Sequence, residues 1–97
     1  MIIVTGTVLA RADSFDALLA VSTDHVLRSR GEAGCISHAV FRDTENPLRL
    51  HFLERWTDMA TLKVHFGVEG SQGFAKSLGT LAAEPPAITL YEATETR

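Results

Sequence analysis

Two titratable side chains, His38 and Glu54, are the residues best placed for acid–base chemistry, because both fall among apolar residues of a predicted hairpin. Residues 35–42 and 48–56 predict two strands, and the polar residues 43–47 between them predict the turn. Pairing with an even sum of residue numbers, near 90, puts the apolar residues of both strands on one face. In that register His38 lies opposite or diagonal to Glu54. The predicted face comprises Ile36, His38, Val40, Leu50, Phe52, Glu54 and Trp56.

A carboxylate on an apolar surface needs a partner, because burying an unpaired charge is strongly unfavourable. His38 is the natural partner of Glu54 within this hairpin. In one interpretation His38 is a general base that Glu54 orients at the wall of a pocket, a role that suits a side chain with an ordinary pKa near ~6.5. In the other, the two form a structural ion pair at a sheet end, or Glu54 accepts from helix backbone. The structural interpretation is the commoner outcome for such pairs.

The remaining elements place this hairpin in an α+β fold. Residues 1–10 predict a first strand buried on both faces, and residues 87–92 predict the last strand. Apolar residues at three- and four-residue spacing predict three amphipathic helices. Asp13-Ser14 is expected to cap the first and Thr57-Asp58 the second, and the third covers residues 71–83. Strand, helix, strand, strand, helices and strand is the ferredoxin-like order, with a four-stranded antiparallel sheet.

The second and third helices carry further candidate residues. Met59, Leu62 and Phe66 predict one apolar stripe, and His65 falls one position off it. His65 either faces the entrance of the pocket or caps the loop that begins at Gly67. The third helix is expected to turn Phe74, Leu78 and Leu81 inward.

One segment resembles a known family. Glu54-Arg55-Trp56-Thr57-Asp58, followed by Leu62, His65 and Phe66, is similar to a recurring segment of the antibiotic biosynthesis monooxygenase family. That segment has Glu-x-Trp at a strand end and then a helix with Leu-x-x-His. The turn Glu32-Ala33-Gly34-Cys35 also resembles the family's Glu-x-Gly-Cys turn. The resemblance implies a homodimeric α+β barrel with a pocket between sheet and helices in each subunit.

The resemblance also implies an activity: oxidation of an electron-rich quinol or polyketide-like aromatic with molecular oxygen, without metal or other cofactor. A base removes an acidic proton, the anion passes an electron to oxygen, and the radicals recombine. The candidate catalytic residues are His38, from the hairpin register, and Glu54 and His65, from the family segment. Trp56 would line the pocket and offer its indole N–H, or close the sheet end as a core residue. The candidate substrate-binding residues are Trp56, Leu62 and Phe66 of the family segment, together with Phe52 and Phe74.

Two departures from the family pattern narrow the substrate. The anthrone-oxidising branch tends to place an amide where this chain has Phe52, and an arginine in the loop where it has Gly70 to Gly73. Both argue against anthrone oxidation. The Asn, Trp and His of the haem-degrading branch are also missing, which argues against haem degradation, whereas quinol oxidation stays open.

Two other functions compete with oxidation. The same pocket would serve a non-catalytic module that binds a small apolar ligand, or the chain could be a structural dimer, because fold does not determine function. An isomerase or decarboxylase that uses the base but no oxygen is a third option.

Composition bounds the partners and the location. The 97 residues fit one domain, 1–97, and a net charge of −3 without a basic cluster argues against nucleic-acid binding. No apolar run reaches the ~20 residues of a membrane helix. A single cysteine and a start without a basic region predict a reducing, cytoplasmic location. A sheet with helices on one face needs cover on the other, and a second copy would supply it.

The histidines do not form a local metal motif. The four are separated by 13, 13 and 14 residues, so no His-x-x-x-His pair exists and no metal is expected. His25 is expected to be partly exposed. His51, with Arg49 and Arg55, is expected to face the partner subunit.

Overall fold

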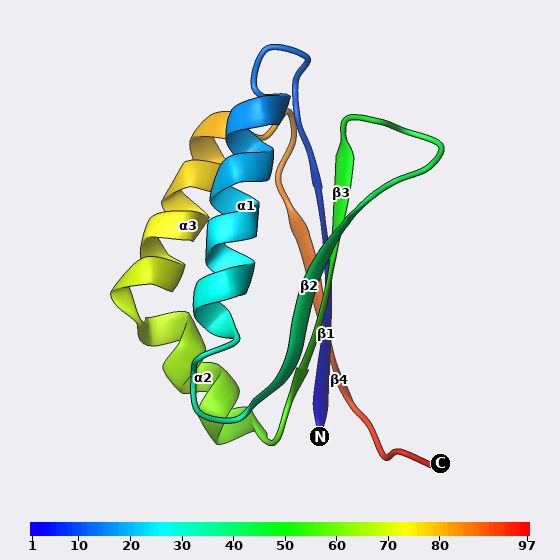
Figure 1. Cartoon of the computed structure of the whole chain (residues 1–97), viewed down its shortest axis with the longest axis vertical. Helices are drawn as coiled ribbons and strands as arrows, with labels where there is room; N and C mark the ends of the chain where they lie inside the picture. The colour runs from blue at the N-terminus through cyan, green and yellow to red at the C-terminus, as the bar shows by residue number, and fades with distance from the viewer.

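The computed structural model describes residues 1–97 and consists of a four-stranded antiparallel sheet with three helices against one face (Figure 1). The strand order is β2-β3-β1-β4. This confirms the predicted ferredoxin-like α+β fold. The strands are β1 (Ile2–Leu9), β2 (Cys35–Arg42), β3 (Arg49–Trp56) and β4 (Ala87–Glu92), and the helices are α1 (Phe15–Ser29), α2 (Met59–Gly67) and α3 (Glu69–Leu81).

The hairpin of β2 and β3 has the predicted parity. His38 pairs with Glu54 and Val40 with Phe52, so paired numbers sum to 92 rather than 90. The prediction for Ile36 is wrong: its side chain is 45% exposed instead of facing the helices. A register shift between Cys35 and Ser37 interrupts the strand there, and a bulge breaks the alternation that the prediction assumed.

Strand β1 is buried on one face only, which corrects the prediction of burial on both. Its helix-facing residues Ile2, Val4 and Val8 are buried, whereas the residues between them are partly exposed. The second face of the sheet carries no helix (Figure 1), so nothing in a single chain covers it. A central strand therefore has the alternating pattern of a one-sided sheet.

The core between sheet and helices consists of two apolar clusters. Glu54 pairs with Val4 of β1 and lies on β3 between Phe52, which belongs to one cluster, and Trp56, which belongs to the other. The polar carboxylate thus separates the two. The larger cluster contains Val8, Ala10, Phe15, Leu18, Val26, Leu50 and Phe52, and the smaller contains Ile2, Val4, Trp56 and Leu62.

The helix caps differ in how they work. Asp58 caps α2 as predicted, because its side chain accepts from the backbone N–H of Thr61 at 2.8 Å. Ser14 precedes α1 but makes no capping bond. Its hydroxyl instead accepts from the backbone N–H of Arg11 at 3.0 Å and donates to the carbonyl of Leu81 at 2.7 Å. This corrects the prediction of a side-chain cap and ties the start of α1 to the end of α3.

Helix α2 is turned differently from the predicted stripe. Leu62 and His65 are buried, whereas Phe66 is 40% exposed. A spacing of three and a spacing of four both fit one helical face, and the interior offers His65 polar partners that Phe66 cannot use. Helix α3 also starts at Glu69, two residues before the predicted start.

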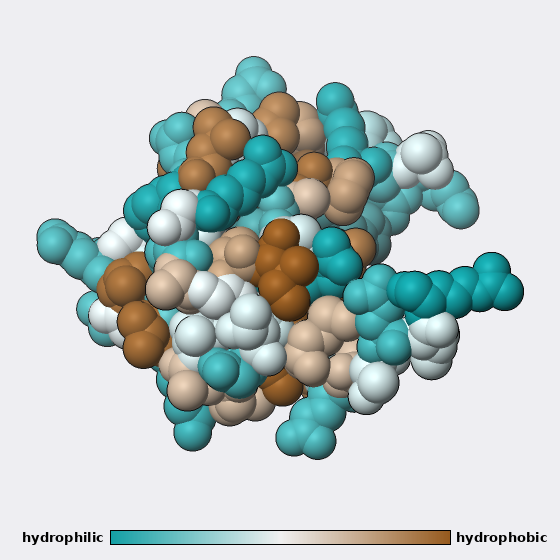
Figure 2. All heavy atoms as spheres, turned by 60° about the horizontal axis from the view of Figure 1, so that its bottom comes forward, coloured by the Kyte–Doolittle hydropathy of each residue, from teal (hydrophilic) through white to brown (hydrophobic).

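The surface shows no single large apolar area on the side in view when the α2 end is turned forward. Hydrophobic side chains form separate groups among hydrophilic ones there (Figure 2). Among the helices, none combines the length and the apolar character needed to cross a membrane.

Gly34 is the backbone position on which the approach of α2 to the start of β2 depends. Its φ is +83°, and a Cβ there would collide with the Thr61 side chain. We expect Gly34→Ala to lower the free energy of unfolding by about 2–4 kcal/mol, from backbone strain plus the clash. Denaturant unfolding measures this. Gly31→Ala is the matched control, since its Cβ meets nothing closer than 3.6 Å; equal losses in both variants would contradict the account.

Asp43 organises the turn of the hairpin. Its Oδ1 accepts from the backbone N–H groups of Glu45 and Asn46, and its Oδ2 lies 2.7 Å from His51 Nε2. The His51 contact, with the two backbone bonds, lowers the pKa of Asp43 to about 2. Its stabilisation is therefore complete above the ordinary carboxyl pKa near ~4 and fades as pH falls toward 2. We expect the stability gap between wild type and Asp43→Ala to be larger at pH 6 than at pH 3; a constant gap would refute this.

Candidate functional site

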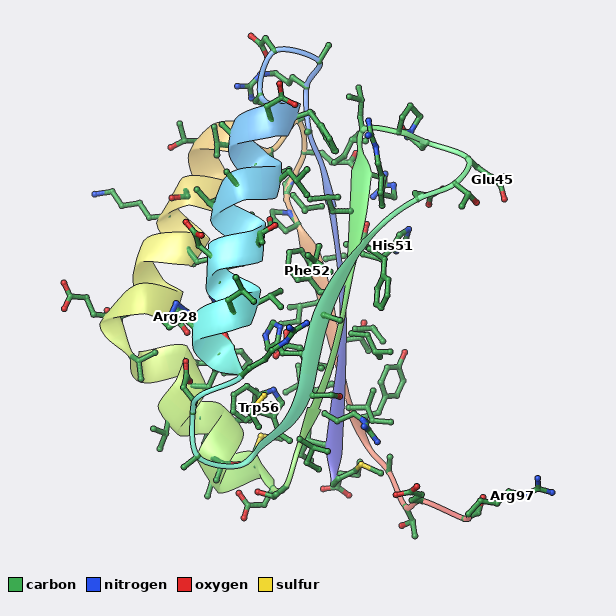
Figure 3. The ribbon with its side chains drawn as sticks, in the orientation of Figure 1. Arg28, Glu45, His51, Phe52, Trp56 and Arg97 are labelled. Atoms are coloured by element: carbon green, nitrogen blue, oxygen red, sulfur yellow. The ribbon has the colours of Figure 1, made fainter.

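Four buried polar side chains from four elements meet between the two apolar clusters. They are His25 of α1, His38 of β2, Glu54 of β3 and His65 of α2, and their exposed fractions are 6%, 1%, 6% and 2%. Phe52 and Trp56, which flank Glu54 on β3, point into the space between sheet and helices, whereas His51 points away from the helices (Figure 3). The alternation of β3 thus brings Glu54 inward.

The Glu54 carboxylate is held through one of its oxygens. Oε1 accepts from the Trp56 indole N–H at 2.9 Å and lies 3.2 Å from His38 Nε2 and 4.0 Å from His65 Nε2. No hydrogen bond or ion pair involves Oε2. Burial raises the pKa of Glu54, but the proximity of His38, with Trp56 and His65, outweighs it and lowers the pKa below the ordinary value. The carboxylate is therefore ionised at neutral pH, with one oxygen free.

His65 faces the interior, which is neither of its two predicted positions. Its Nδ1 lies 2.8 Å from Glu32 Oε1 and 3.4 Å from the Ser71 hydroxyl. Its ring centre lies 4.5 Å from that of Trp56. Glu32 follows α1 and thus lies outside the hairpin. Its contact with Nδ1 fixes the orientation of the His65 ring, so that Nε2 points toward Glu54.

His25 is the site residue that the sequence analysis missed. It was predicted to be partly exposed, and that prediction is wrong. Its ring stacks on Phe74 with centres 4.0 Å apart, and its Nδ1 lies 2.6 Å from Arg28 Nη2. The helical spacing could have predicted its burial, because His25 falls on the buried face of α1. That face comprises Leu18, Ser22, His25, Val26 and Ser29.

The protonation state of His25 follows from its surroundings. Burial, together with His38, Arg28 and His65, lowers its pKa to about 3, so the imidazole is neutral at pH 7. Arginine can only donate hydrogen bonds, so Nδ1 must accept from Arg28. The ring proton of neutral His25 therefore lies on Nε2, where it can donate.

A cavity of about 360 Å³ opens between the sheet and α3, beside this cluster. Its size lies in the range of roughly 300–1,000 Å³ that is typical of small-molecule sites. Gly6 on β1 and Gly79 on α3 contribute no side chains to it, which leaves room between the two layers. Only His25 and Glu54 bring ionisable groups to its wall. The lining comprises Gly6, Thr7, Val8, His25, Phe52, Glu54, Phe74, Ala75, Leu78, Gly79, Pro86, Ala87 and Ile88.

The predicted site residues divide into three groups. Phe52, Glu54 and Phe74 line the cavity. His38 and His65 lie behind Glu54 and do not reach the wall. Trp56 and Leu62 are fully buried in the smaller apolar cluster, and Phe66 lies at the surface, so the cavity wall includes none of Trp56, Leu62 and Phe66.

The three buried histidines also lie close enough to share an ion. One ring nitrogen from each of His25, His38 and His65 lies within 4.8 Å of the others. The three belong to different elements, so their distant sequence spacing could not reveal the cluster. Chemically, the arrangement offers an apolar cavity, one carboxylate at its wall, and imidazoles that can store a proton or bind a metal.

Comparison with known proteins gives consistent matches. Residues 1–77 match the sequence profile of the family described as Antibiotic biosynthesis monooxygenase. A protein of Synechocystis sp., itself uncharacterized, is 30% identical over 96 residues, which is 99% of this chain and 65% of that relative. The chain thus spans just under two thirds of that relative's length.

Solved structures match over nearly the whole chain. A crystal structure from Deinococcus radiodurans that carries the same family name is 26% identical, with a TM-score of 0.94 over 100% of this chain and 96% of that one. A structure from Mycobacterium tuberculosis is 23% identical, with a TM-score of 0.91 over 97% of this chain and 95% of that one, and shows the likeness in fold.

Two glycines of α3 allow a matched test of the cavity. A Cβ at Gly79 or at Gly73 meets no atom within 4 Å, but only Gly79 lines the cavity. Either glycine replaced by leucine gains up to about 1 kcal/mol of helix propensity. We expect 2-naphthol to raise the unfolding temperature of the wild type and of Gly73→Leu. Its affinity for Gly79→Leu should be at least tenfold lower than its affinity for the wild type. Equal affinities would show that the ligand binds elsewhere.

Proposed function

The chain belongs to the antibiotic biosynthesis monooxygenase family, and on this basis we propose that it oxidises a small electron-rich aromatic of the quinol or polyketide type with molecular oxygen. No cofactor takes part in the proposed reaction. The observation that carries the proposal is a carboxylate, Glu54, with a free oxygen at the wall of a mainly apolar cavity. A dry cavity with one positioned base suits proton abstraction from a phenol or an activated C–H.

The proposed reaction begins with transfer of the substrate proton to Glu54 Oε2. The substrate anion passes one electron to oxygen, and the resulting superoxide and substrate radical combine in a C–O bond. The peroxide anion takes the proton back from Glu54. The hydroperoxide then loses the hydrogen that remains on the oxygenated carbon as a proton, and its outer oxygen as hydroxide, which yields a carbonyl and water. One oxygen atom stays in the product and the other leaves as water, as a monooxygenase requires.

Only groups at the cavity wall can touch the substrate, so Glu54 is the proposed catalytic residue. His38 and His65 act through it as positioning residues that stabilise the negative charge and can receive the proton. The Nε2–H of His25 can donate to the substrate anion. Phe52 and Phe74, whose ring centres lie 5.8 Å apart, form the aromatic part of the wall.

We also propose that the active form is a homodimer. The sheet face without helices carries the exposed apolar side chains Phe41, Leu53 and Tyr91, and His51 points toward the same side (Figure 3). A second copy that packs its own sheet there would bury them, at roughly 25 cal/mol per Å² of apolar area.

Oxygen uptake with a panel of hydroquinones tests the proposed function. We expect turnover by the wild type and a fall of about 10²–10⁴-fold in kcat for Glu54→Gln, because the amide cannot accept the proton. Lys63→Ala is the control, because Lys63 is exposed on α2 and belongs neither to the cavity lining nor to the proposed dimer face.

Three outcomes would contradict oxidation by Glu54. Unchanged kcat in Glu54→Gln removes the proposed base. Thermal stabilisation by the aromatic panel without any turnover would favour a ligand-binding module. Turnover at the same rate without oxygen would favour an isomerase or decarboxylase.

A further inference from the structure

The three buried imidazoles form a compact triangle. Their ring centres lie 5.2 Å apart for His25–His38, 5.2 Å for His25–His65 and 5.7 Å for His38–His65. Tetrahedral zinc, with Zn–N bonds of about 2.0–2.1 Å, places its imidazole centres about 5 Å apart. The triangle of rings already has nearly this size.

His38 is the member of the cluster that the protein alone satisfies least. His38 is 1% exposed; its Nδ1 has no hydrogen-bond partner, and its Nε2 has only the ion-pair contact with Glu54 Oε1 at 3.2 Å. A buried polar group without a partner is costly. A metal ion bound to one His38 nitrogen would supply a partner that the chain lacks.

The surroundings resemble the supporting shell of a metal site. Glu32 bonds His65 Nδ1 at 2.8 Å, and metal-bound histidines are typically oriented by a carboxylate in this way. Glu54 Oε1, near His38 and His65, offers a fourth ligand and a negative charge. The ring nitrogens, up to 4.8 Å apart, must close by ~1 Å or more to reach the separation of about 3.3 Å in a tetrahedral site.

Arg28 is the group that opposes a cation here. Its guanidinium lies 2.6 Å from His25 Nδ1, and its positive charge must move aside before His25 can rearrange its ring proton and bind. The Arg28 side chain is 36% exposed and so has solvent to move into. Its removal should therefore strengthen metal binding.

We propose that His25, His38, His65 and Glu54 bind one divalent transition-metal ion of the zinc class, and that the bound ion switches off the oxidation. Imidazole nitrogens with one carboxylate suit zinc or cobalt rather than calcium or magnesium. The second half rests on the proposed function: the ion occupies the groups that would take the substrate proton. The first half holds whether or not the chain is an oxidase.

Cobalt(II) is the probe for the metal site, because its visible absorption reports four-coordinate geometry. We expect one Co²⁺ per chain, displaced by Zn²⁺, and loss of the signal in His38→Gln and His65→Gln. Glu32→Gln should weaken binding about 10–100-fold, as loss of a supporting carboxylate does elsewhere. Arg28→Gln should strengthen it. His51→Ala, which removes a surface histidine, should leave the signal unchanged, and circular dichroism should show each variant folded.

The outcomes separate the two proposals. Absence of the four-coordinate signal in folded wild type, or a signal lost only in His51→Ala, overturns the metal site. A retained signal in folded His38→Gln and His65→Gln overturns the assigned ligands. A normal cobalt signal with undiminished oxygen uptake overturns only the inhibition, and a normal signal without any oxygen uptake in metal-free protein refutes the oxidase alone.

Discussion

The burial of one carboxylate is the constraint around which the interior is organised. Glu54 lies on the helix-facing side of the sheet, where an uncompensated charge would cost several kcal/mol. The fold compensates it with the Trp56 indole N–H and with His38 and His65. These partners come from β3, β2 and α2, so the charge and the tertiary arrangement depend on each other. Removing a partner would disturb the packing as well as the chemistry.

The same arrangement explains why the cavity lies where it does. The carboxylate divides the apolar interior into two clusters, and the cavity opens beside the larger one, where Gly6 and Gly79 leave space. Phe52 and Phe74 close its sides, and Glu54 supplies the one acidic group at its wall. A mainly apolar cavity with a few fixed polar groups, here Glu54 and His25, is typical of small-molecule sites. Substrate binding and proton transfer would thus use one compact region of the chain.

Much of the fold could be predicted because alternation and capping are local. The limits of β2 and β4, the parity of the hairpin and the Asp58 cap all follow from residues near one another in sequence. The errors arose where tertiary contacts decide. A bulge turns Ile36 outward, and a partner on another element, Glu32, draws His65 rather than Phe66 inward. The pairing of His38 with Glu54 was predictable from the hairpin. Which of the two lines the cavity was not, and the structure places Glu54 rather than His38 at the wall.

The central claim is that the free oxygen of Glu54 meets the acidic group of a bound aromatic. A crystal structure of the protein with 2-naphthol tests this most directly. The account predicts the naphthol hydroxyl within hydrogen-bond distance of Glu54 Oε2, about 2.5–3.0 Å, with the rings between Phe52 and Phe74. A naphthol bound in this cavity with its hydroxyl turned to solvent, or bound outside the cavity altogether, would contradict it.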